Sequence, residues 1–291
     1  MNVGFVGLGR MGSLMAQNLI AAGHALVVHD IKQENCAAAI EAGATWADGP
    51  SDLARHCETI ISSVPGPVEV AAVMTGLDGI LAGVREGTLI IETSTIGPAQ
   101  SRDLYQQFAV KKAVYLDATV NRIRLDAVAE GRMTIMVGGS AAEFERALPI
   151  LNILGDRIHH VGATGSGNVV KLLNQMIFLS YVEVFSEGIA LGERLGIDLG
   201  TMLKVFSTSA AAHPMIADKY EQIEAGDDAP GFAINRVVKD LDLVAELCAE
   251  ATFSARGFHT ILDSFRRAED KGFSDKDMTV LHNLFRDHTI T

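Results

Sequence analysis

The stretch that decides the fold is Val3-Gly4-Phe5-Val6-Gly7-Leu8-Gly9-Arg10-Met11-Gly12. Its first four residues predict a buried strand, and the residues from Met11 to Ala22 predict a helix. Between them, Gly7 permits a tight turn, Gly9 lets backbone amides approach a pyrophosphate, and Gly12 lets the helix pack closely against the strand. The helix N-terminus adds N–H groups and a partial positive charge. We therefore expect a dinucleotide-binding turn whose cofactor-binding residues are Gly7, Leu8, Gly9, Arg10, Met11 and Gly12.

The second expected strand ends in His29-Asp30, and Asp30 lies 23 positions after Gly7 (30 − 7 = 23). An acidic residue there accepts hydrogen bonds from the adenosine ribose hydroxyls and repels a 2′-phosphate. Asp30 therefore favours NAD over NADP as the cofactor. Lys32, two residues further on, can soften that preference.

Short apolar runs alternate with helical patterns through the first half of the chain. Residues 11–22 and 141–154 are examples of the helical patterns. The apolar runs predict buried strands at Val3–Val6, Ala25–Val28, Thr59–Ser62, Leu89–Ile91, Val114–Leu116 and Thr134–Val137. Near-continuous apolar runs are typical of a parallel sheet that is covered on both faces. The alternation predicts an α/β fold with a Rossmann-type, doubly wound sheet.

The pattern changes at a glycine-rich break, residues 162–167, after which it is helical almost to the end. A long apolar helix is expected from about 166 to 195; at ~1.5 Å per residue it spans roughly 45 Å, enough to join two domains. Further helices are expected at Leu199–Ser207, Pro214–Glu224 and Phe232–Ala251, with a final pair from about Ala255. We thus expect a dinucleotide-binding domain over 1–163 and an all-helical C-terminal domain over 164–291.

The amino-acid composition limits which classes of partner and which cellular compartment are expected. The 291 residues carry a formal net charge of −12, which argues against nucleic acid or an anionic membrane as the main partner. No uninterrupted apolar run approaches the ~18 residues of a membrane span, and no signal peptide precedes the first strand. Three scattered cysteines without a C-x-x-C pair are typical of reduced thiols. We expect a cytoplasmic protein.

Four segments together resemble the β-hydroxyacid dehydrogenase family, which includes the 3-hydroxyisobutyrate dehydrogenases. They are the run from Gly7 to Leu19, the segments Asp117-Ala118-Thr119-Val120 and Glu130-Gly131-Arg132-Met133-Thr134, the run Gly165-Ser166-Gly167-Asn168-Val169-Val170-Lys171, and Phe232 with Lys239-Asp240-Leu241. They occur in the family's order and span the chain. The resemblance implies an NAD-dependent oxidoreductase that acts on CH–OH groups.

The segment after the glycine-rich break places polar residues where an apolar helix does not favour them. Asn168, Lys171, Asn174 and Gln175 share one helix face at spacings i, i+3, i+6 and i+7. Buried polar groups cost free energy unless they are satisfied, so the stripe suggests a site. Alcohol oxidation needs a group that takes the hydroxyl proton. The resemblance implies that Lys171 is this general acid/base and that Asn174 positions it or the substrate; Gln175 stands where the family often has a second Asn.

The segment after Asp117 departs from the family, whose members usually continue with Ser-Gly-Gly. Here the residues are Asn121, Arg122 and Ile123, followed by Arg124. Arginine presents a planar fork of donors that suits carboxylate, sulfonate or phosphate. We expect Asn121 and either Arg122 or Arg124 to bind the substrate, and a Gly-Arg pair in this slot of sulfolactaldehyde reductases makes a sulfonate one option beside a 3-hydroxy acid or a 3-hydroxy amino acid.

Other candidates follow strand ends or lie on a later helix. Val64 and Pro65 are expected to line the cofactor, and Thr95 to lie near the nicotinamide ribose or the substrate. The resemblance places Phe232 and Lys239 near the cofactor and Asp240 near the substrate. No metal signature is present; His159-His160 has no partner at metal-ligand spacing.

Several alternatives stay open. A semialdehyde reductase such as a sulfolactaldehyde reductase would run the same chemistry in the other direction. A non-enzymatic NAD-binding sensor or scaffold would keep the fold but would not need Lys171. Imine reductases share the architecture but replace the lysine. The substrate expected is a small anionic hydroxy acid, and the apolar helix suggests a homodimer or homotetramer.

Overall fold

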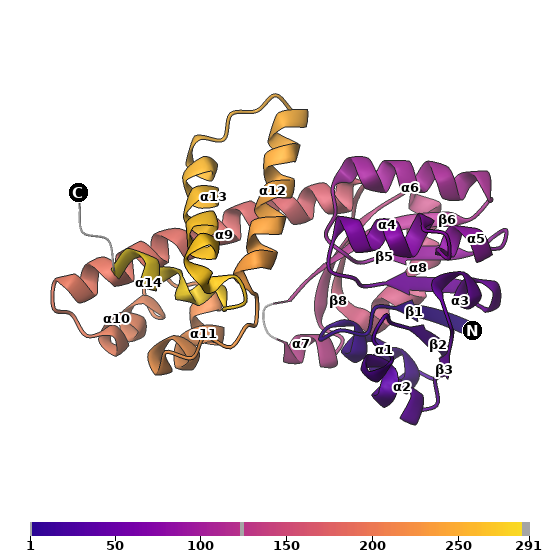
Figure 1. The fold of residues 1–291 in the computed structure, drawn as a ribbon, viewed down its shortest axis with the longest axis horizontal. Coiled ribbons are helices and arrows are strands. Elements are labelled where there is room, and N and C mark those ends of the chain that lie inside the picture. The colour runs from indigo at the N-terminus through magenta and orange to yellow at the C-terminus, as the bar shows by residue number, and fades with distance from the viewer. Residues whose placement is uncertain (1, 123–124, 287–291) are drawn as a thin grey trace. The chain divides into compact units, whose positions relative to one another are not determined.

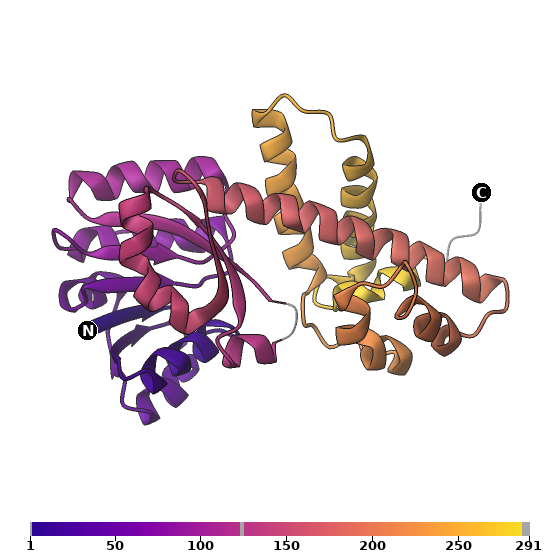
Figure 2. The ribbon, with the colours of Figure 1, turned by 180° about the vertical axis from the view of Figure 1, so that it is seen from behind.

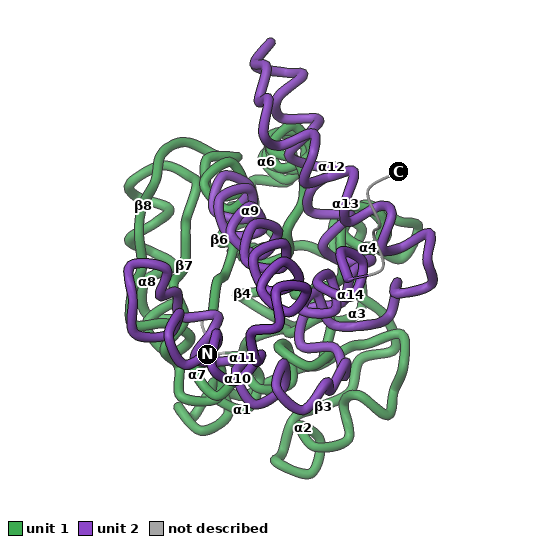
Figure 3. Tube along the Cα trace, turned by 90° about the vertical axis from the view of Figure 1, so that its left-hand side faces the viewer, with its two compact units in different colours: residues 1–171 green, residues 172–291 purple. Residues whose placement is uncertain are grey.

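The computed structural model describes residues 2–122 and 125–286. The chain divides into two compact units, Met1–Lys171 and Leu172–Thr291, which Figure 3 colours separately. The first unit is built on a sheet and the second on helices. This is the expected combination of a Rossmann-type sheet with an all-helical C-terminal region.

Eight strands of the described residues form one sheet in the order β3-β2-β1-β4-β5-β6-β7-β8. The strands are β1 (Asn2–Val6), β2 (Ala25–His29), β3 (Thr45–Trp46), β4 (Thr59–Ser62), β5 (Leu89–Glu92), β6 (Val114–Asn121), β7 (Met133–Gly138) and β8 (Gly155–Gly162). All six expected strands are present. Strand β3 was not predicted because it has two residues, and the pattern did not separate β8 from the break that follows it.

The sheet is mostly parallel, as expected, and departs from parallel pairing at one position, because β7 runs antiparallel to β6. The other neighbouring strands are parallel, and β8 is parallel to β7. A parallel return needs a crossover of about a dozen or more residues that includes a helix able to cover the sheet. The connection between Asn121 and Met133 is short for that, and among its described residues the structure has one helix, the four-residue α7 (Asp126–Ala129).

Helices cover both faces of this sheet, as Figures 1 and 2 show. Alternate strand residues point into two separate cores: Ile61, Ile91 and Leu116 into one, Ile60 and Ile90 into the other. The first core is completed by α1 (Gly12–Ala21), α2 (Ala37–Glu41), α7 and α8 (Ala141–Leu154); the second by α3 (Pro50–His56), α4 (Pro67–Thr75), α5 (Ile80–Gly83) and α6 (Pro98–Val110). A short 3-10 helix, η1 (Gln33–Cys36), precedes α2. The sheet is therefore doubly wound, with its strand ends fixed from both sides.

The second unit is helical throughout its described residues. Its elements are α9 (Ser166–Arg194), whose first residues belong to the first unit, α10 (Leu199–Phe206), α11 (Pro214–Ala225), α12 (Ile234–Glu250), α13 (Arg256–Ala268), η2 (Glu269–Phe273), η3 (Met278–Val280) and α14 (Leu281–Arg286). Leu172, Leu179 and Val182 of α9 pack with α12, α13 and α14 in one core. The long helix therefore begins and ends within one residue of the expected bounds.

Helix α9 is the exception to the expectation that no segment approaches a membrane span. By length and composition it can cross a membrane: its most apolar 18-residue window has a mean hydropathy of 1.3, and 39% of that window is buried. Interspersed Asn, Lys, Gln and Glu residues hid this from a search for an uninterrupted run. The core helix of a globular protein passes the same test, and α9 supplies Leu172, Leu179 and Val182 to such a core.

Candidate active site

The glycine-rich turn has the backbone geometry that its sequence requires. Gly7 has a φ of 89°, in the left-handed region that favours glycine, and its N–H donates to the His29 carbonyl at 3.0 Å. A Cβ on Gly12 would collide with the Gly7 carbonyl oxygen, whereas a Cβ on Gly9 would meet no atom within 4 Å. The turn is thus tight at Gly7, packed at Gly12 and open at Gly9, which is where a pyrophosphate can approach.

Asp30 follows β2 and is tied directly to this turn. Its Oδ2 accepts the Leu8 N–H at 2.8 Å, and its Oδ1 accepts the Lys32 N–H at 2.9 Å and the Asn35 Nδ2 at 3.0 Å. A carboxylate has about four lone-pair sites, so Asp30 keeps capacity for a ribose hydroxyl. Lys32 is exposed, and Ile31 beside Asp30 is 91% exposed. The residues at the end of β2 thus fit the adenosine end of a dinucleotide.

The loops after β4 and β5 are joined to each other at the carboxyl edge of the sheet. The Val64 N–H donates to Ser94 Oγ at 2.8 Å, and the Ser94 N–H donates to Glu92 Oε1 at 2.7 Å. Pro65 is exposed and Thr95 is half-buried. The expected cofactor-lining residues Val64 and Thr95 therefore lie on two loops that share a hydrogen-bonded framework.

Glu92 is the last residue of β5 and is fully buried. Burial raises its pKa from 4.5 to about 7, and hydrogen bonds from Ser94 oppose that rise. The sequence pattern pointed to the segment Ser94-Thr95 at this strand end, but Glu92 was missed. The signal was present, because an acidic residue ending the apolar run Leu89-Ile90-Ile91 is unusual for a buried strand.

The first turn of α9 packs on β6 and leads directly to Lys171. Asp117 of β6 accepts the N–H groups of Gly165 and Asn168, at 2.7 and 3.0 Å. The Asn168 side chain accepts the Ile96 N–H at 3.0 Å, which joins this turn to the loop that contains Thr95. Lys171 follows Asn168 by one turn and is 7% exposed. The expected polar stripe therefore faces inward here, and Asp117, for which no separate role was predicted, holds its start.

Strand β6 leads to the expected substrate-binding residues. It is parallel to β5, so Asn121 at its end lies at the same edge of the sheet as the loop with Thr95. Asn121 and Arg122 are both half-buried. Arg124, the other arginine predicted to bind the anion, and Ile123 lie outside the described residues.

In the second unit, hydrogen bonds and an ion pair between side chains connect the remaining candidates, apart from Phe232. Gln175 Nε2 donates to Asp240 Oδ2 at 2.7 Å, and Lys239 Nζ lies 2.6 Å from Asp240 Oδ1. Asn174 Nδ2 donates to Gln175 Oε1 at 3.4 Å, a long hydrogen bond. Gln175 and Asp240 are buried, and Lys239 is partly exposed. Gln175, noted only as a departure from the family, is thus the partner of Asp240.

Phe232 is separate from that group. It is partly buried and packs against the core of the second unit. Its N–H donates to Asp277 Oδ2 at 3.0 Å, so the backbone here is fixed independently of Lys239 and Asp240.

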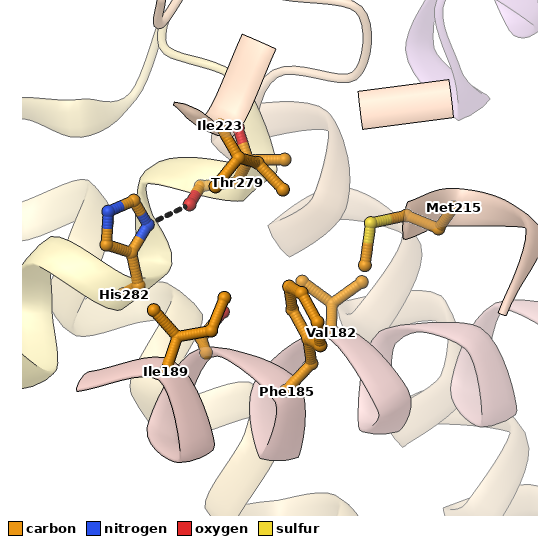
Figure 4. A pocket seen from close by; sticks show the side chains of 8 residues that line it. Val182, Phe185, Ile189, Met215, Ile223, Thr279 and His282 are labelled. Atoms are coloured by element: carbon orange, nitrogen blue, oxygen red, sulfur yellow. Dashed lines mark hydrogen bonds between the residues drawn. The ribbon is translucent and has the colours of Figure 1, made fainter. Parts of the chain in front are cut away.

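A cavity in the second unit holds none of the expected site residues. It measures about 10 Å³, near the lower limit for one water, and Figure 4 shows it among side chains of α9, α11, η3 and α14. Its lining is mostly apolar, with His282 Nδ1 contacting the Thr279 carbonyl at 2.7 Å. Among residues 2–122 and 125–286, no group of three His, Cys, Asp or Glu side chains is placed to hold a metal ion.

Family models match almost the whole chain. Residues 2–162 match the NAD binding domain of 6-phosphogluconate dehydrogenase, and residues 165–285 match the NAD-binding domain of NADP-dependent 3-hydroxyisobutyrate dehydrogenase. The chain belongs to the β-hydroxyacid dehydrogenase family. This dehydrogenase is accordingly an NAD-dependent oxidoreductase, as the four sequence segments implied.

Characterised relatives of this dehydrogenase act on different compounds. It is 32% identical over 288 residues to 2-(hydroxymethyl)glutarate dehydrogenase of Eubacterium barkeri, a match that covers 99% of this chain and 95% of the relative. It is 30% identical over 290 residues to the NAD-dependent L-serine dehydrogenase of Pseudomonas aeruginosa, covering 97% of each. The crystal structure of a 3-hydroxyisobutyrate dehydrogenase from Salmonella typhimurium matches with a TM-score of 0.91 at 28% identity, covering 98% of this chain and 100% of that one.

Proposed function

We propose that this dehydrogenase interconverts a small anionic β-hydroxy acid and its aldehyde or ketone, with Lys171 as the general acid/base. The observation that supports the proposal most is the placement of Lys171. It is buried one turn into a helix whose start is hydrogen-bonded to the loop with Thr95. An ordinary surface lysine would need neither burial nor such a support.

The cofactor assigned to this site is NAD. When bound, NAD supplies the acceptor for the hydride that leaves the alcohol carbon. The turn from Gly7 to Gly12, including Leu8, Arg10 and Met11, would hold the pyrophosphate, and Asp30 the adenosine ribose. Val64, Pro65 and Thr95 would line the cofactor at the sheet edge, and Phe232 and Lys239 remain proposed contacts from the second unit. Residues 1–163 are then the dinucleotide-binding domain and 164–291 the helical domain.

Lys171 would take the proton from the substrate hydroxyl as the carbon loses hydride, and would return it in the reduction. Asn174 follows Lys171 by three residues on α9, so the two side chains occupy neighbouring positions of one helix face. We assign Asn174 to positioning the lysine or the hydroxyl. Asp240 is assigned to the substrate side, where its hydrogen bond from Gln175 limits its rotation.

The substrate anion is assigned to Asn121 and Arg122. Both are half-buried and follow from β6, whose end lies at the same sheet edge as Thr95. The arginine fork suits a carboxylate or a sulfonate, and Asn121 can hold a hydroxyl or an amino group. This residue pair supports a 3-hydroxy acid, a 3-hydroxy amino acid or a sulfonate analogue, with a semialdehyde reductase as the reverse reaction.

A homodimer or homotetramer remains a prediction. An apolar stripe supports it. Leu173, Ile177, Val184 and Leu191 on α9, and Leu195 directly after it, are exposed at spacings of four and seven residues, which places the helical ones along one face. A second copy of the chain, offering the same stripe, is the proposed occupant. Sedimentation that shows only monomer would rule this out. We also infer a cytoplasmic protein, in keeping with its sparse, unpaired cysteines.

The test is NADH formation by the wild-type protein with a panel of hydroxy acids. The panel contains 3-hydroxyisobutyrate, D- and L-serine, D- and L-threonine, glycerate, 4-hydroxybutyrate and 2,3-dihydroxypropanesulfonate. We expect turnover of at least one compound, and for that compound a KM raised about tenfold or more in Arg122→Ala. The matched control is Arg157→Ala, at an exposed arginine on β8.

Two results would contradict this proposal. Tight NAD binding with no turnover of any panel compound, in either direction, favours the non-enzymatic sensor or scaffold. Turnover with an unchanged KM in Arg122→Ala removes Arg122 from the substrate and leaves the dehydrogenase assignment intact.

A further inference from the structure

Asp117 is a buried carboxylate that the proposed mechanism does not use. It is 0% exposed on β6, an inner strand of the sheet between β5 and β7. Both of its oxygens accept backbone N–H groups at the start of α9: Oδ1 from Gly165 and Oδ2 from Asn168. The first N–H groups of a helix have no partners within the helix, and its N-terminus favours a negative charge. Asp117 therefore caps α9 from a neighbouring strand.

Asn168 extends this contact to two further elements. Its Oδ1 accepts the Ile96 N–H at 3.0 Å, and its Nδ2 donates to Ser101 Oγ of α6 at 2.9 Å. Asn168 is itself 0% exposed, and Ile96 is the residue directly after Thr95. One asparagine thus joins the start of α9 to the loop after β5 and to the helix that follows it.

The first turn of α9 lies close against β6 and β7. A Cβ on Gly167 would lie 2.6 Å from the carbonyl oxygen of Met136 on β7 and 2.8 Å from Asp117 Oδ2 on β6. Thr119, also on β6 and 0% exposed, donates its hydroxyl to the Gly167 carbonyl at 2.9 Å. Backbone of the helix therefore lies directly against β6 and β7.

We propose that Asp117 and Asn168 are positioning residues that fix Lys171 relative to Thr95. We name their shared hydrogen bonds to Gly165, Ile96 and Ser101 the Asp117–Asn168 bridge. The bridge spans the strand that leads to Asn121, the helix that carries Lys171 and the loop that carries Thr95. Neither residue touches the reacting atoms; each acts through Lys171. The proposal rests on the proposed function, because it gives Lys171 its catalytic role.

A carboxylate is the group that this position requires. It accepts hydrogen bonds on both oxygens, whereas the amide of an Asp117→Asn variant must turn its NH₂ group towards one of the two N–H donors. Burial raises the pKa of Asp117, and the N–H groups that point at its oxygens oppose that rise by favouring the charged form. Loss of one acceptor would leave an N–H group at the start of α9 without its hydrogen bond.

Amide hydrogen exchange on the full chain tests the bridge without any substrate. In Asp117→Asn we expect exchange of residues 165–168 to become at least about tenfold faster, because a buried N–H group loses its acceptor. In Asn168→Ser we expect the same rise at residues 95–97, while residue 165 stays protected by Asp117. Asp156→Asn, at an exposed position on β8, is the matched control. Unchanged exchange in both variants would overturn the bridge, and Asn168→Ser decides if Asp117→Asn does not fold.

Enzyme kinetics test whether the bridge acts through Lys171. With NAD and either 3-hydroxyisobutyrate or L-serine, we expect kcat of Asp117→Asn to fall about 10- to 100-fold while the Kd for NAD is unchanged. Added to Lys171→Ala, the same change should have little further effect, because a positioning residue has nothing left to position. Losses of Asp117→Asn and Lys171→Ala that simply add would overturn the assignment, and so would a kcat of Asp117→Asn equal to the wild-type value.

The two proposals fail in distinguishable ways. If Lys171→Ala keeps the wild-type rate, the proposed function is wrong even if hydrogen exchange detects the bridge. If Lys171→Ala abolishes turnover and Asp117→Asn leaves both kcat and exchange unchanged, only the bridge is wrong.

Discussion

The two units hold their buried carboxylates in different ways. In the sheet unit, Asp30 and Asp117 accept hydrogen bonds mainly from backbone N–H groups, of Leu8 and Lys32 and of Gly165 and Asn168. In the helical unit, Asp240 and Asp277 also pair with lysines, whereas the buried Glu183 accepts the Ser264 hydroxyl. Asp240 lies 2.6 Å from Lys239 Nζ, and Asp277 lies 3.0 Å from Lys219 Nζ.

The difference follows from what each fold can offer. The carboxyl edge of a parallel sheet and the starts of helices present unsatisfied N–H groups, so a carboxylate can be held there by backbone alone. A helix interior has no spare N–H groups, so a buried carboxylate within a bundle relies more on side chains. Asp277, which precedes η3, has both kinds of partner, because it also accepts the N–H groups of Gly231 and Phe232. The buried carboxylates of the sheet unit are therefore held mainly by backbone, and those of the helical unit more by side chains that a single substitution can remove.

The largest effect on the free energy of unfolding is expected at Asp277, a buried carboxylate that pairs with a lysine in the helical unit. Its Oδ2 accepts the N–H groups of Gly231 and Phe232 and the Lys219 ammonium, and the pair is 0% and 10% exposed. Asp277→Ala leaves a buried lysine uncompensated and should lower the free energy of unfolding by about 3–5 kcal/mol. Chemical denaturation measures this, with the exposed Asp270→Ala as control; a loss equal to that of the control would mean that Lys219 does not depend on Asp277.

A second prediction concerns Glu92, the sheet unit's carboxyl with a strongly raised pKa. Because that pKa is about 7 in the folded protein and 4.5 ordinarily, the folded state binds the proton more tightly than the unfolded state. The resulting stability is fully present below about pH 4.5 and is lost as pH rises through about 7. Glu92→Gln cannot ionise. Relative to wild type, its free energy of unfolding should gain about 2–3 kcal/mol between pH 5 and pH 8.

Urea titrations at the two pH values check this, with the exposed Glu86→Gln as the matched variant. A difference between Glu92→Gln and wild type that is the same at pH 5 and pH 8 would mean that Glu92 is ionised in the folded protein at both. Backbone support would then account for the three buried acidic residues in the described part of the sheet unit, Asp30, Glu92 and Asp117.

The smallest effect is expected from a substitution at Asp30. The backbone hydrogen bonds around this residue should keep the cofactor-binding turn folded. Asp30→Asn retains an oxygen for the Leu8 N–H but removes the charge that repels a 2′-phosphate. We expect the ratio of kcat/KM for NAD to that for NADP to fall about tenfold, the size of one charge-assisted hydrogen bond. Glu34→Gln, an exposed acid of the same loop, should leave the ratio unchanged. An unaltered ratio in Asp30→Asn would place cofactor selection elsewhere.

Much of the fold was predictable because its signals are local. The glycine-rich turn, the apolar strand runs and the bounds of α9 follow from periodicity and from glycine positions a few residues apart. The reversal of β7 was not predictable from strand composition, because apolar runs look alike in either direction; the shortness of the β6–β7 connection was the available clue. The two-residue strand β3 is too short for any period to register.

The candidate site was predictable in part, because some of its residues belong to local motifs. Lys171 and Asp30 were predictable because each belongs to a motif of residues that lie close together in the sequence. The partners that hold them do not: Asp117 meets Asn168 across 51 positions, and Gln175 meets Asp240 across 65. Such pairs become visible only when the fold brings the segments together. In the sequence, such a partner is recognisable as an acidic residue within an otherwise apolar strand, as with Asp117 and Glu92.

The most direct test of the account is the rate of NADH formation by Lys171→Ala at saturating NAD, with the panel compound that wild type turns over fastest. We expect kcat to fall at least about 100-fold, as for the loss of a general acid/base, with the Kd for NAD unchanged. Lys111→Ala, at an exposed lysine of the same unit, should match wild type. A Lys171→Ala enzyme that keeps the wild-type rate would contradict the assignment of the proton transfer to this helix.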